Sequence, residues 1–235
     1  MATLKARPAC LSRPGTDTLM PMEGKTRPIL DRFVVFEGLD GAGTTTQLGM
    51  LDSALAKAGV PHWITFEPST HPAGRLVRQV LRGEVAACPE TLARLFSADR
   101  HEHIQGSGGI TEHLKMGELV ICDRYIFSSL AYQGVACGPE LPRLLNADFP
   151  LPELLVYFDL PSAVAMKRVE SREEREIFET LSMQERVRSA YEASLLEFAD
   201  SGMRILRVDA TRSVAEVGAT ILEEVMGLAS RPDTN

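Results

Sequence analysis

The 235-residue sequence has no long apolar run, few cysteines and no excess of basic residues. Because no hydrophobic stretch approaches the roughly eighteen residues of a membrane helix, we expect a soluble protein without a membrane partner. The net charge of −7 argues against a broad basic surface for nucleic acid and favours small phosphorylated ligands. The four cysteines lack CxxC spacing, so a reducing, cytoplasmic location follows most simply.

Both ends of the chain are poor in apolar residues. Residues 1–29 hold prolines and glycines among polar residues, which predicts a flexible N-terminal extension without a secretory signal. A weak organelle-targeting sequence is the alternative because basic residues lie among them, and a later methionine is an alternative start. We expect one domain over residues 30–229 and a polar tail over residues 230–235.

Short apolar runs alternate with helical patterns from residue 33 onward. Each run is apolar on successive residues, which predicts parallel strands covered by helices on both faces. The predicted fold is therefore an α/β three-layer sandwich (α/β/α) with a five-stranded parallel sheet. Such sheets bind ligands beyond the carboxyl ends of their strands. The five predicted strands are residues 33–37, 62–66, 118–122, 154–158 and 204–208.

A glycine-rich loop directly follows the first run and precedes a helical pattern. Gly38, Gly43 and Thr45 match the glycines and the hydroxyl of the phosphate-loop pattern GxxxxGK[ST], but Thr44 stands where lysine belongs. Glycines let backbone N–H groups surround phosphate oxygens. A tight turn whose glycines serve only packing is the weaker alternative. The loop predicts an ATP site formed by Gly38, Asp40, Gly41, Ala42, Gly43, Thr44, Thr45 and Thr46.

The missing lysine leaves a charge to be supplied by another group. A cation about 4 Å from a phosphate contributes on the order of 4 kcal/mol at an effective dielectric constant near 20. We therefore expect an arginine elsewhere in the chain to take over that charge.

Four segments resemble the thymidylate kinase family, in order between about residues 32 and 225. They read FEGLDGAGTTTQ, FEPS, LFSADR and CDRYIFSSLAYQG, and the last is the most specific. The resemblance implies a P-loop NTPase fold and the transfer of the γ-phosphate of ATP to dTMP, giving dTDP and ADP. It further implies Mg²⁺ as cofactor, nucleotides as the only ligands and, typically, a homodimer.

The resemblance also implies the residues of the dTMP site. It makes Phe96 the ring that stacks on thymine, Arg100 the donor to a thymine carbonyl, and Arg124 the ligand of the acceptor phosphate. From spacing alone, Phe96 would join the core and Arg100 would pair with a carboxylate, so both assignments rest on the resemblance. The remaining residues that it assigns to dTMP are Asp40, Phe66, Ser129, Tyr132 and Gln133.

An Asp-Arg pair closes the third predicted strand. There an acid can assist Mg²⁺ and an arginine can bridge two phosphates, although a helix cap or a surface ion pair is the ordinary alternative. We predict Thr45 and Asp123 as metal ligands. No general base is needed, because the second pKa of a phosphate monoester is about 6. The predicted catalytic residues are Asp40, Arg124, Arg172 and Arg175.

A charged segment after the fourth predicted strand is the expected lid. Gly41 stands where some family members carry a catalytic arginine, and the resemblance implies that members with glycine there use arginines from a lid. We predict the lid at about residues 167–178, with Arg168, Arg172 and Arg175 as candidates. A solvated helix with locally paired charges is the alternative, and Ile177, at the position of a frequent family arginine, keeps it open.

Three histidines, His101, His103 and His113, could suggest a metal site. Because residues two apart on a helix point in different directions, we expect these side chains at the surface instead. Two other functions stay open. Another nucleotide or deoxynucleoside kinase would share the loop and the Asp-Arg pair, and a nucleotide-binding module that has lost catalysis would account for Thr44.

Overall fold

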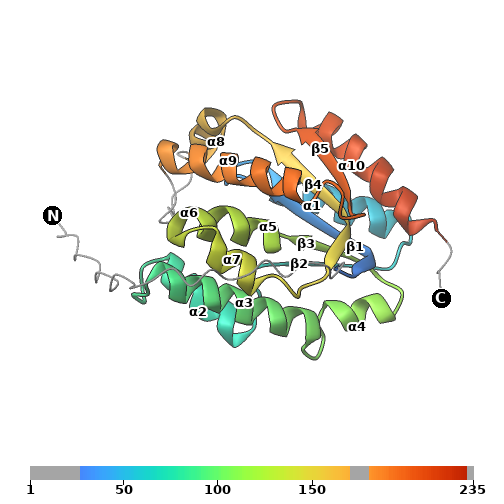
Figure 1. Ribbon diagram of the computed structural model, residues 1–235. Helices are drawn as coiled ribbons and strands as arrows, with labels where there is room; N and C mark the ends of the chain where they lie inside the picture. Colours follow the sequence, from blue (N-terminus) through green and yellow to red (C-terminus); the bar gives the residue numbers. More distant parts are fainter. Residues whose placement is uncertain (1–26, 170–179, 232–235) are drawn as a thin grey trace.

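A computed structural model describes residues 27–169 and 180–231 of the chain (Figure 1). All strand pairs are parallel, and the sheet order is β2-β3-β1-β4-β5. The predicted five-stranded parallel sheet is thereby confirmed. The strands are β1 (Ile29–Gly38), β2 (His62–Phe66), β3 (Leu119–Asp123), β4 (Leu151–Asp159) and β5 (Arg204–Asp209).

Helices cover both faces of the sheet, as the apolar runs predict. On one face α1 (Thr44–Lys57) and α10 (Val214–Ala229) pack against each other (Figure 1). The helices between β2 and β5 lie toward the other face and complete the three-layer sandwich. They are α2 (Pro72–Leu81), α3 (Pro89–Gln105), α4 (Ile110–Lys115), α5 (Ile126–Ser128), the π-helical turn η1 (Ser129–Gln133), α6 (Gly134–Cys137), α7 (Glu140–Leu145), α8 (Ser162–Val169) and α9 (Leu181–Glu197).

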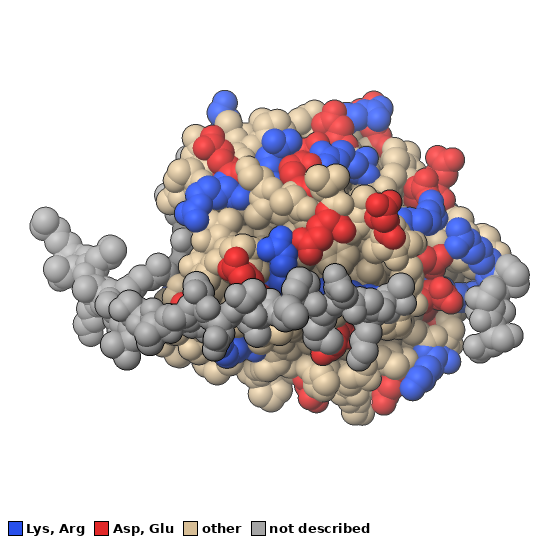
Figure 2. Space-filling model, in the orientation of Figure 1, with Lys and Arg blue, Asp and Glu red and all other residues tan. Residues whose placement is uncertain are grey.

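The three central strands form the core. Residues 33–36 of β1, 119–122 of β3 and 154–158 of β4 are almost completely buried, because helices on both sides remove their side chains from water. Within the described ranges, no helix has both the length and the apolar character that a membrane crossing requires. Acidic and basic side chains are interspersed over the described part of the face in Figure 2.

The arrangement of β1 and β3 positions the site. These neighbouring strands lead to helices on opposite faces, α1 and α5, and open α/β sheets bind ligands in the crevice that such a divergence leaves. Phe36 of β1 is in register with Asp123 of β3, and the N–H of Arg124 donates to the carbonyl of Phe36 at 2.9 Å. The loop after β1 and the Asp-Arg pair therefore meet at one edge of the sheet.

Candidate active site

The loop between β1 and α1 is held by two glycines in the left-handed region. Gly41 has φ 83° and Gly43 has φ 94°, and residues other than glycine adopt such values only with backbone strain. A Cβ atom on Gly41 would also lie 2.7 Å from the carbonyl oxygen of Ala165 in α8. Helix α1 begins at Thr44, so the free N–H groups of its first turn are available to an anion at this loop.

Thr44, at the lysine position of the pattern, faces the acid that closes β3. Its hydroxyl donates to Oδ2 of Asp123 at 3.4 Å, and Oδ1 of Asp123 is buried without a partner among the described residues. Burial raises the pKa of Asp123. A buried carboxylate oxygen without a donor, close to the threonines that begin α1, suits a hard cation with oxygen ligands. Asp123 therefore fits Mg²⁺, and Thr45, the residue after Thr44 on α1, stays a predicted ligand.

Arg124 joins the phosphate loop to the opposite wall of the crevice. Its guanidinium donates to Oδ1 of Asp40 at 2.6 Å and to the carbonyl of Gly38 at 3.3 Å. Its φ of 68° is unusual for a residue other than glycine, and strained backbone of this kind concentrates at functional sites. The Tyr132 hydroxyl donates to Oδ2 of Asp40 at 3.0 Å, and the Arg124 guanidinium lies over the Tyr132 ring. The side chains of Arg124 and Asp40 are thus held together within the crevice.

A buried carboxylate, Glu37, supports this arrangement from the end of β1. It accepts hydrogen bonds from the backbone of Tyr125 (2.8 Å) and Ser128 (3.1 Å), and from the hydroxyls of Ser128 (2.6 Å) and Tyr191 (2.9 Å). Both hydroxyls in turn accept from NH1 of Arg124, at 3.0 and 3.4 Å. Burial raises the pKa of Glu37 to about 7. Glu37 therefore orients Arg124 indirectly, through Ser128 and Tyr191.

A pocket, here called the Arg124 pocket, opens beside these groups. It contains most residues that the resemblance assigns to dTMP, and adds several residues that sequence reasoning missed. Ser128 is one of these additions, and it is adjacent to the predicted Ser129. The lining residues are Asp40, Glu67, Pro68, Leu81, Phe96, Arg100, Arg124, Tyr125, Ser128, Tyr132 and Gln133.

Two residues assigned to dTMP lie outside this lining. Phe66 is 44% exposed and packs its ring against the guanidinium of Arg78, because side chains alternate along β2 and Thr65 takes the inward position. Ser129 is buried, and its hydroxyl accepts from Arg100 at 3.1 Å. Ser129 therefore supports the pocket from behind.

Arg100 is almost completely buried at the back of the Arg124 pocket. Its Nε and NH2 groups donate to Oε2 of Glu67 at 2.9 and 2.6 Å, and NH2 also donates to the carbonyl of Tyr125 at 2.9 Å. NH1 donates to the side chain of Asn146. Arg100 thus pairs with a carboxylate, as spacing alone predicts, and at the same time contributes to the pocket wall.

A second hollow lies on the other side of the phosphate loop. It is lined by Gly41, Ala42, Gly43, Thr46, Gln47, Phe158, Arg168, Ala210, Arg212, Val214 and Val217. Arg168 donates to the carbonyl of Gly41 at 3.3 Å and to that of Ala210 at 3.1 Å. Arg172 and Arg175, with most of the predicted lid, lie outside the described residues.

The prediction that the three histidines lie at the surface is wrong for His103. His101 is exposed and His113 stacks on Trp63, but His103 is buried against Glu67 and Thr65. His103 follows Arg100 by three residues on α3, so the two share the face turned toward the sheet. The three-residue spacing from Arg100 is the feature of the sequence that could have predicted a buried His103.

Comparison with known proteins agrees with this geometry. The sequence model of the family described as thymidylate kinase matches residues 36–221. A thymidylate kinase of Leptospira interrogans serogroup Icterohaemorrhagiae serovar copenhageni (strain Fiocruz L1-130) is 40% identical over 167 residues, 69% of this chain and 81% of that protein.

Two further relatives cover more of the chain. The thymidylate kinase of Leptospira borgpetersenii serovar Hardjo-bovis (strain L550) is 35% identical over 195 residues, 81% of this chain and 91% of that protein. A protein of Treponema pallidum (strain Nichols) that bears the same name provisionally is 41% identical over 200 residues, 84% of this chain and 96% of that protein. These similarities span most of the sheet and its helices, and the chain belongs to the thymidylate kinase family.

Proposed function

We propose that this protein transfers the γ-phosphate of ATP to dTMP, giving dTDP and ADP. The observation that carries the proposal is the place of Arg124. Its guanidinium contacts the carbonyl of Gly38 in the phosphate loop and also lines the Arg124 pocket, so one cation faces both the donor and the acceptor side.

The acceptor site is assigned to the Arg124 pocket. Phe96 offers an apolar ring to the thymine base, and Arg100 offers an N–H donor to a base carbonyl. Tyr132, held against Asp40 at 3.0 Å, is the ring that the family resemblance assigns to the sugar, where it would crowd a ribose 2′-hydroxyl. The proposed dTMP residues within the pocket are Asp40, Phe96, Arg100, Arg124, Tyr132 and Gln133, with Ser129 behind them. A role for Phe66 has no support from its exposed position.

The donor site is assigned to the phosphate loop and the hollow beside it. Backbone N–H groups at the start of α1, from Thr44 to Thr46, would hold the donor phosphates, and Arg168, which lines the hollow, would take over part of the charge that lysine gives in the usual pattern. Arg172 and Arg175 stay predictions as further cations of the lid. Mg²⁺ bound to Asp123 and Thr45 would neutralise charge on the donor phosphates.

The protein's part in transfer is positioning and charge neutralisation. In phosphoryl transfer the acceptor oxygen must lie in line with the donor phosphorus while negative charge on the moving group is stabilised. Arg124 supplies positive charge, and Asp40, Ser128 and Tyr191 limit the directions that its guanidinium can take. The acceptor phosphate needs no general base, because it is deprotonated near neutral pH.

A coupled assay tests the function directly. We expect ADP formation that requires dTMP, ATP and Mg²⁺ together, with dTMP preferred over dCMP, UMP and thymidine. Turnover with another acceptor but not with dTMP would support a different nucleotide or deoxynucleoside kinase. Binding of ATP and dTMP in calorimetry without transfer would support a nucleotide-binding module, and either result would contradict the proposal.

Three wider features stay proposals. Ile29, the last residue of the predicted extension, pairs with Leu151 in the sheet. The part of the extension before β1 and the tail over 230–235 are proposed to lie outside the catalytic domain, which limited proteolysis checks. A homodimer follows from the family resemblance, and light scattering checks it. A cytoplasmic location is likewise proposed, and fractionation of cells checks it.

A further inference from the structure

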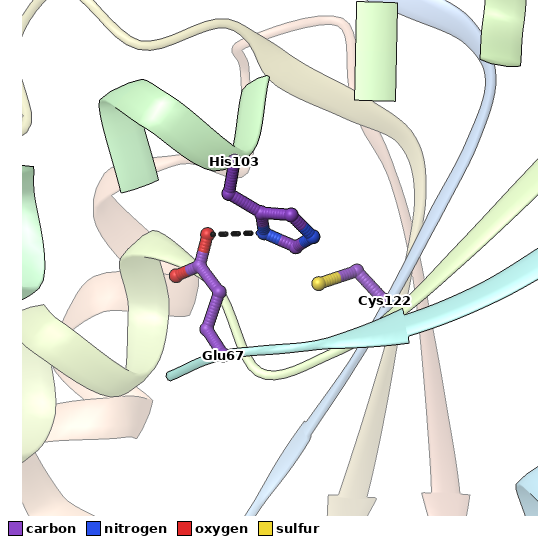
Figure 3. Close-up of side chains that lie close together, drawn as sticks. All are labelled: Glu67, His103 and Cys122. Carbon is purple, nitrogen blue, oxygen red and sulfur yellow. Dashed lines mark hydrogen bonds and ion pairs between the residues drawn. The ribbon is translucent and has the colours of Figure 1, made fainter. Parts of the chain in front are cut away.

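Behind the Arg124 pocket lies a buried cluster of three side chains, Glu67, His103 and Cys122 (Figure 3). Nδ1 of His103 is 3.3 Å from Oε1 of Glu67, and Nε2 of His103 is 2.7 Å from the hydroxyl of Thr65. Figure 3 shows the three side chains converging, with the thiol of Cys122 pointing toward the other two. All three residue types can bind metals, so the cluster needs an explanation.

The surroundings of the cluster argue against a metal. Oε2 of Glu67 already accepts two N–H groups from Arg100, so an added cation would lie close to a guanidinium. Both ring nitrogens of His103 have hydrogen-bond partners. Burial raises the pKa of Cys122, which keeps the thiol protonated and makes it a poor ligand.

The same contacts form a chain that ends at the pocket. An ionised carboxylate only accepts hydrogen bonds, so Nδ1 of His103 carries the proton and donates to Glu67. The other oxygen of Glu67 holds Arg100 through Nε and NH2. NH1 of Arg100 carries two hydrogens, and among the described residues it has one acceptor, the side chain of Asn146. One N–H of Arg100 is thus without an acceptor among the described residues, and Arg100 lines the pocket.

We propose that His103 is a positioning residue for recognition of the nucleotide base, acting through Glu67 on Arg100. The proposal rests on dTMP as the ligand of the Arg124 pocket. His103 fixes the carboxylate of Glu67, and Glu67 in turn fixes the plane of the guanidinium. Arg100 can then donate to a base carbonyl but offers no acceptor to a base amino group, which favours thymine over cytosine.

Two replacements of His103 separate this role from simple packing. The amide nitrogen of asparagine occupies the place of Nδ1 and can still donate to Glu67, whereas that of glutamine approximates Nε2 and loses this contact. We expect His103→Gln to raise KM for dTMP about tenfold, because a hydrogen bond to a charged group is lost. His103→Asn is expected to stay within about threefold of wild type. KM for ATP is expected to stay unchanged in both.

Further measurements tie the effect to the base. The ratio of kcat/KM for dTMP over dCMP is expected to fall in His103→Gln and to persist in His103→Asn. Calorimetry of dTMP gives the dissociation constant independently of transfer, and urea unfolding shows whether both variants are folded. His101→Ala, an exposed position on the same helix, is the matched control and is expected to behave as wild type.

The results separate the two proposals. A wild-type protein that neither phosphorylates nor binds dTMP overturns the proposed function. A wild type that phosphorylates dTMP, with equal KM shifts in the two His103 variants or a loss of kcat alone, overturns the role of His103 and leaves the function standing.

Discussion

The guanidinium of Arg124 donates to Oδ1 of Asp40 at 2.6 Å, with 24% and 25% of the two side chains exposed. The pair joins the end of β3 to the loop after β1, two segments that are far apart in the sequence. Its partial exposure leaves the guanidinium accessible to a ligand from the pocket. An arginine held on its inner side by Asp40, Ser128 and Tyr191 is preorganised before any phosphate arrives.

Replacing Arg124 tests that preorganisation. We expect Arg124→Lys to lower kcat about a hundredfold or more at saturating substrates, because one ammonium group cannot contact Asp40, Ser128 and a phosphate together. Arg124→Ala is expected to lose at least as much. Steady-state kinetics with both substrates varied measures the effect. Full kcat in the lysine variant would mean that positive charge alone suffices.

The threonine at the lysine position can be replaced by the residue of the usual pattern. Thr44→Lys is expected to lower KM for ATP by tenfold or more, since an ammonium group near phosphate contributes up to about 4 kcal/mol. Thr44→Met, of similar length but uncharged, is the matched control. The gain is expected to shrink as salt concentration rises. An equal effect of methionine and lysine would refute a charge deficit at this position.

The buried carboxylate of β1 predicts a pH dependence of stability. The pKa of Glu37 rises from 4.5 to about 7 on folding. The folded protein therefore binds this proton more tightly than the unfolded chain, and the contribution of Glu37 to stability falls as pH rises through that window. Relative to Glu37→Gln, wild type is expected to lose about 3 kcal/mol of unfolding free energy between pH 4.5 and pH 7.

Urea unfolding of both proteins over a series of pH values measures this difference. Glu102→Gln, at an exposed position on α3, is the control and is expected to keep the wild-type pH dependence. A constant difference between wild type and Glu37→Gln across the window would contradict the raised pKa.

Alanine substitutions at the two loop glycines distinguish the cost of backbone strain from the cost of a steric clash. Alanine at Gly41 or Gly43 must adopt a positive φ, which costs about 1–2 kcal/mol. At Gly41 the new Cβ would also meet the carbonyl oxygen of Ala165, whereas at Gly43 it would meet no atom within 4 Å. We therefore expect Gly41→Ala to lower the unfolding free energy more than Gly43→Ala does, in urea titrations of each. Equal losses would show that α8 moves away without cost.

The sequence predicts the sheet well because its strands carry an unambiguous local signal. Uninterrupted apolar runs such as FVVFE and LLVYF require helices on both faces, and the phosphate-loop spacing fixes which strand precedes the loop. The observed strand boundaries differ from the predicted ones by a few residues only. For example, β1 begins at Ile29, whereas the predicted strand begins at residue 33.

The supporting shell of the site is harder to predict, because it depends on contacts between distant segments. Glu37 reads as the last residue of an apolar run, yet Tyr191, from more than a hundred positions later, helps to satisfy it. Ser128 and Ser129 are indistinguishable by local pattern, and only the folded structure shows that Ser128 lines the pocket while Ser129 bonds to Arg100 behind it. His103 looks like a surface residue until the partner of Arg100 is known.

The burial of Arg100 has a consequence for how ligands act on the whole molecule. Its guanidinium is held by Glu67 after β2, by Tyr125 and Ser129 after β3, and by Asn146 after α7. These segments meet through folding, so the pocket is lost when any one of them unfolds. Nucleotide binding is therefore linked to global unfolding, and every ligand of the pocket raises the melting temperature with its concentration. A thermal-shift screen can rank nucleotides for this pocket without any phosphate being transferred.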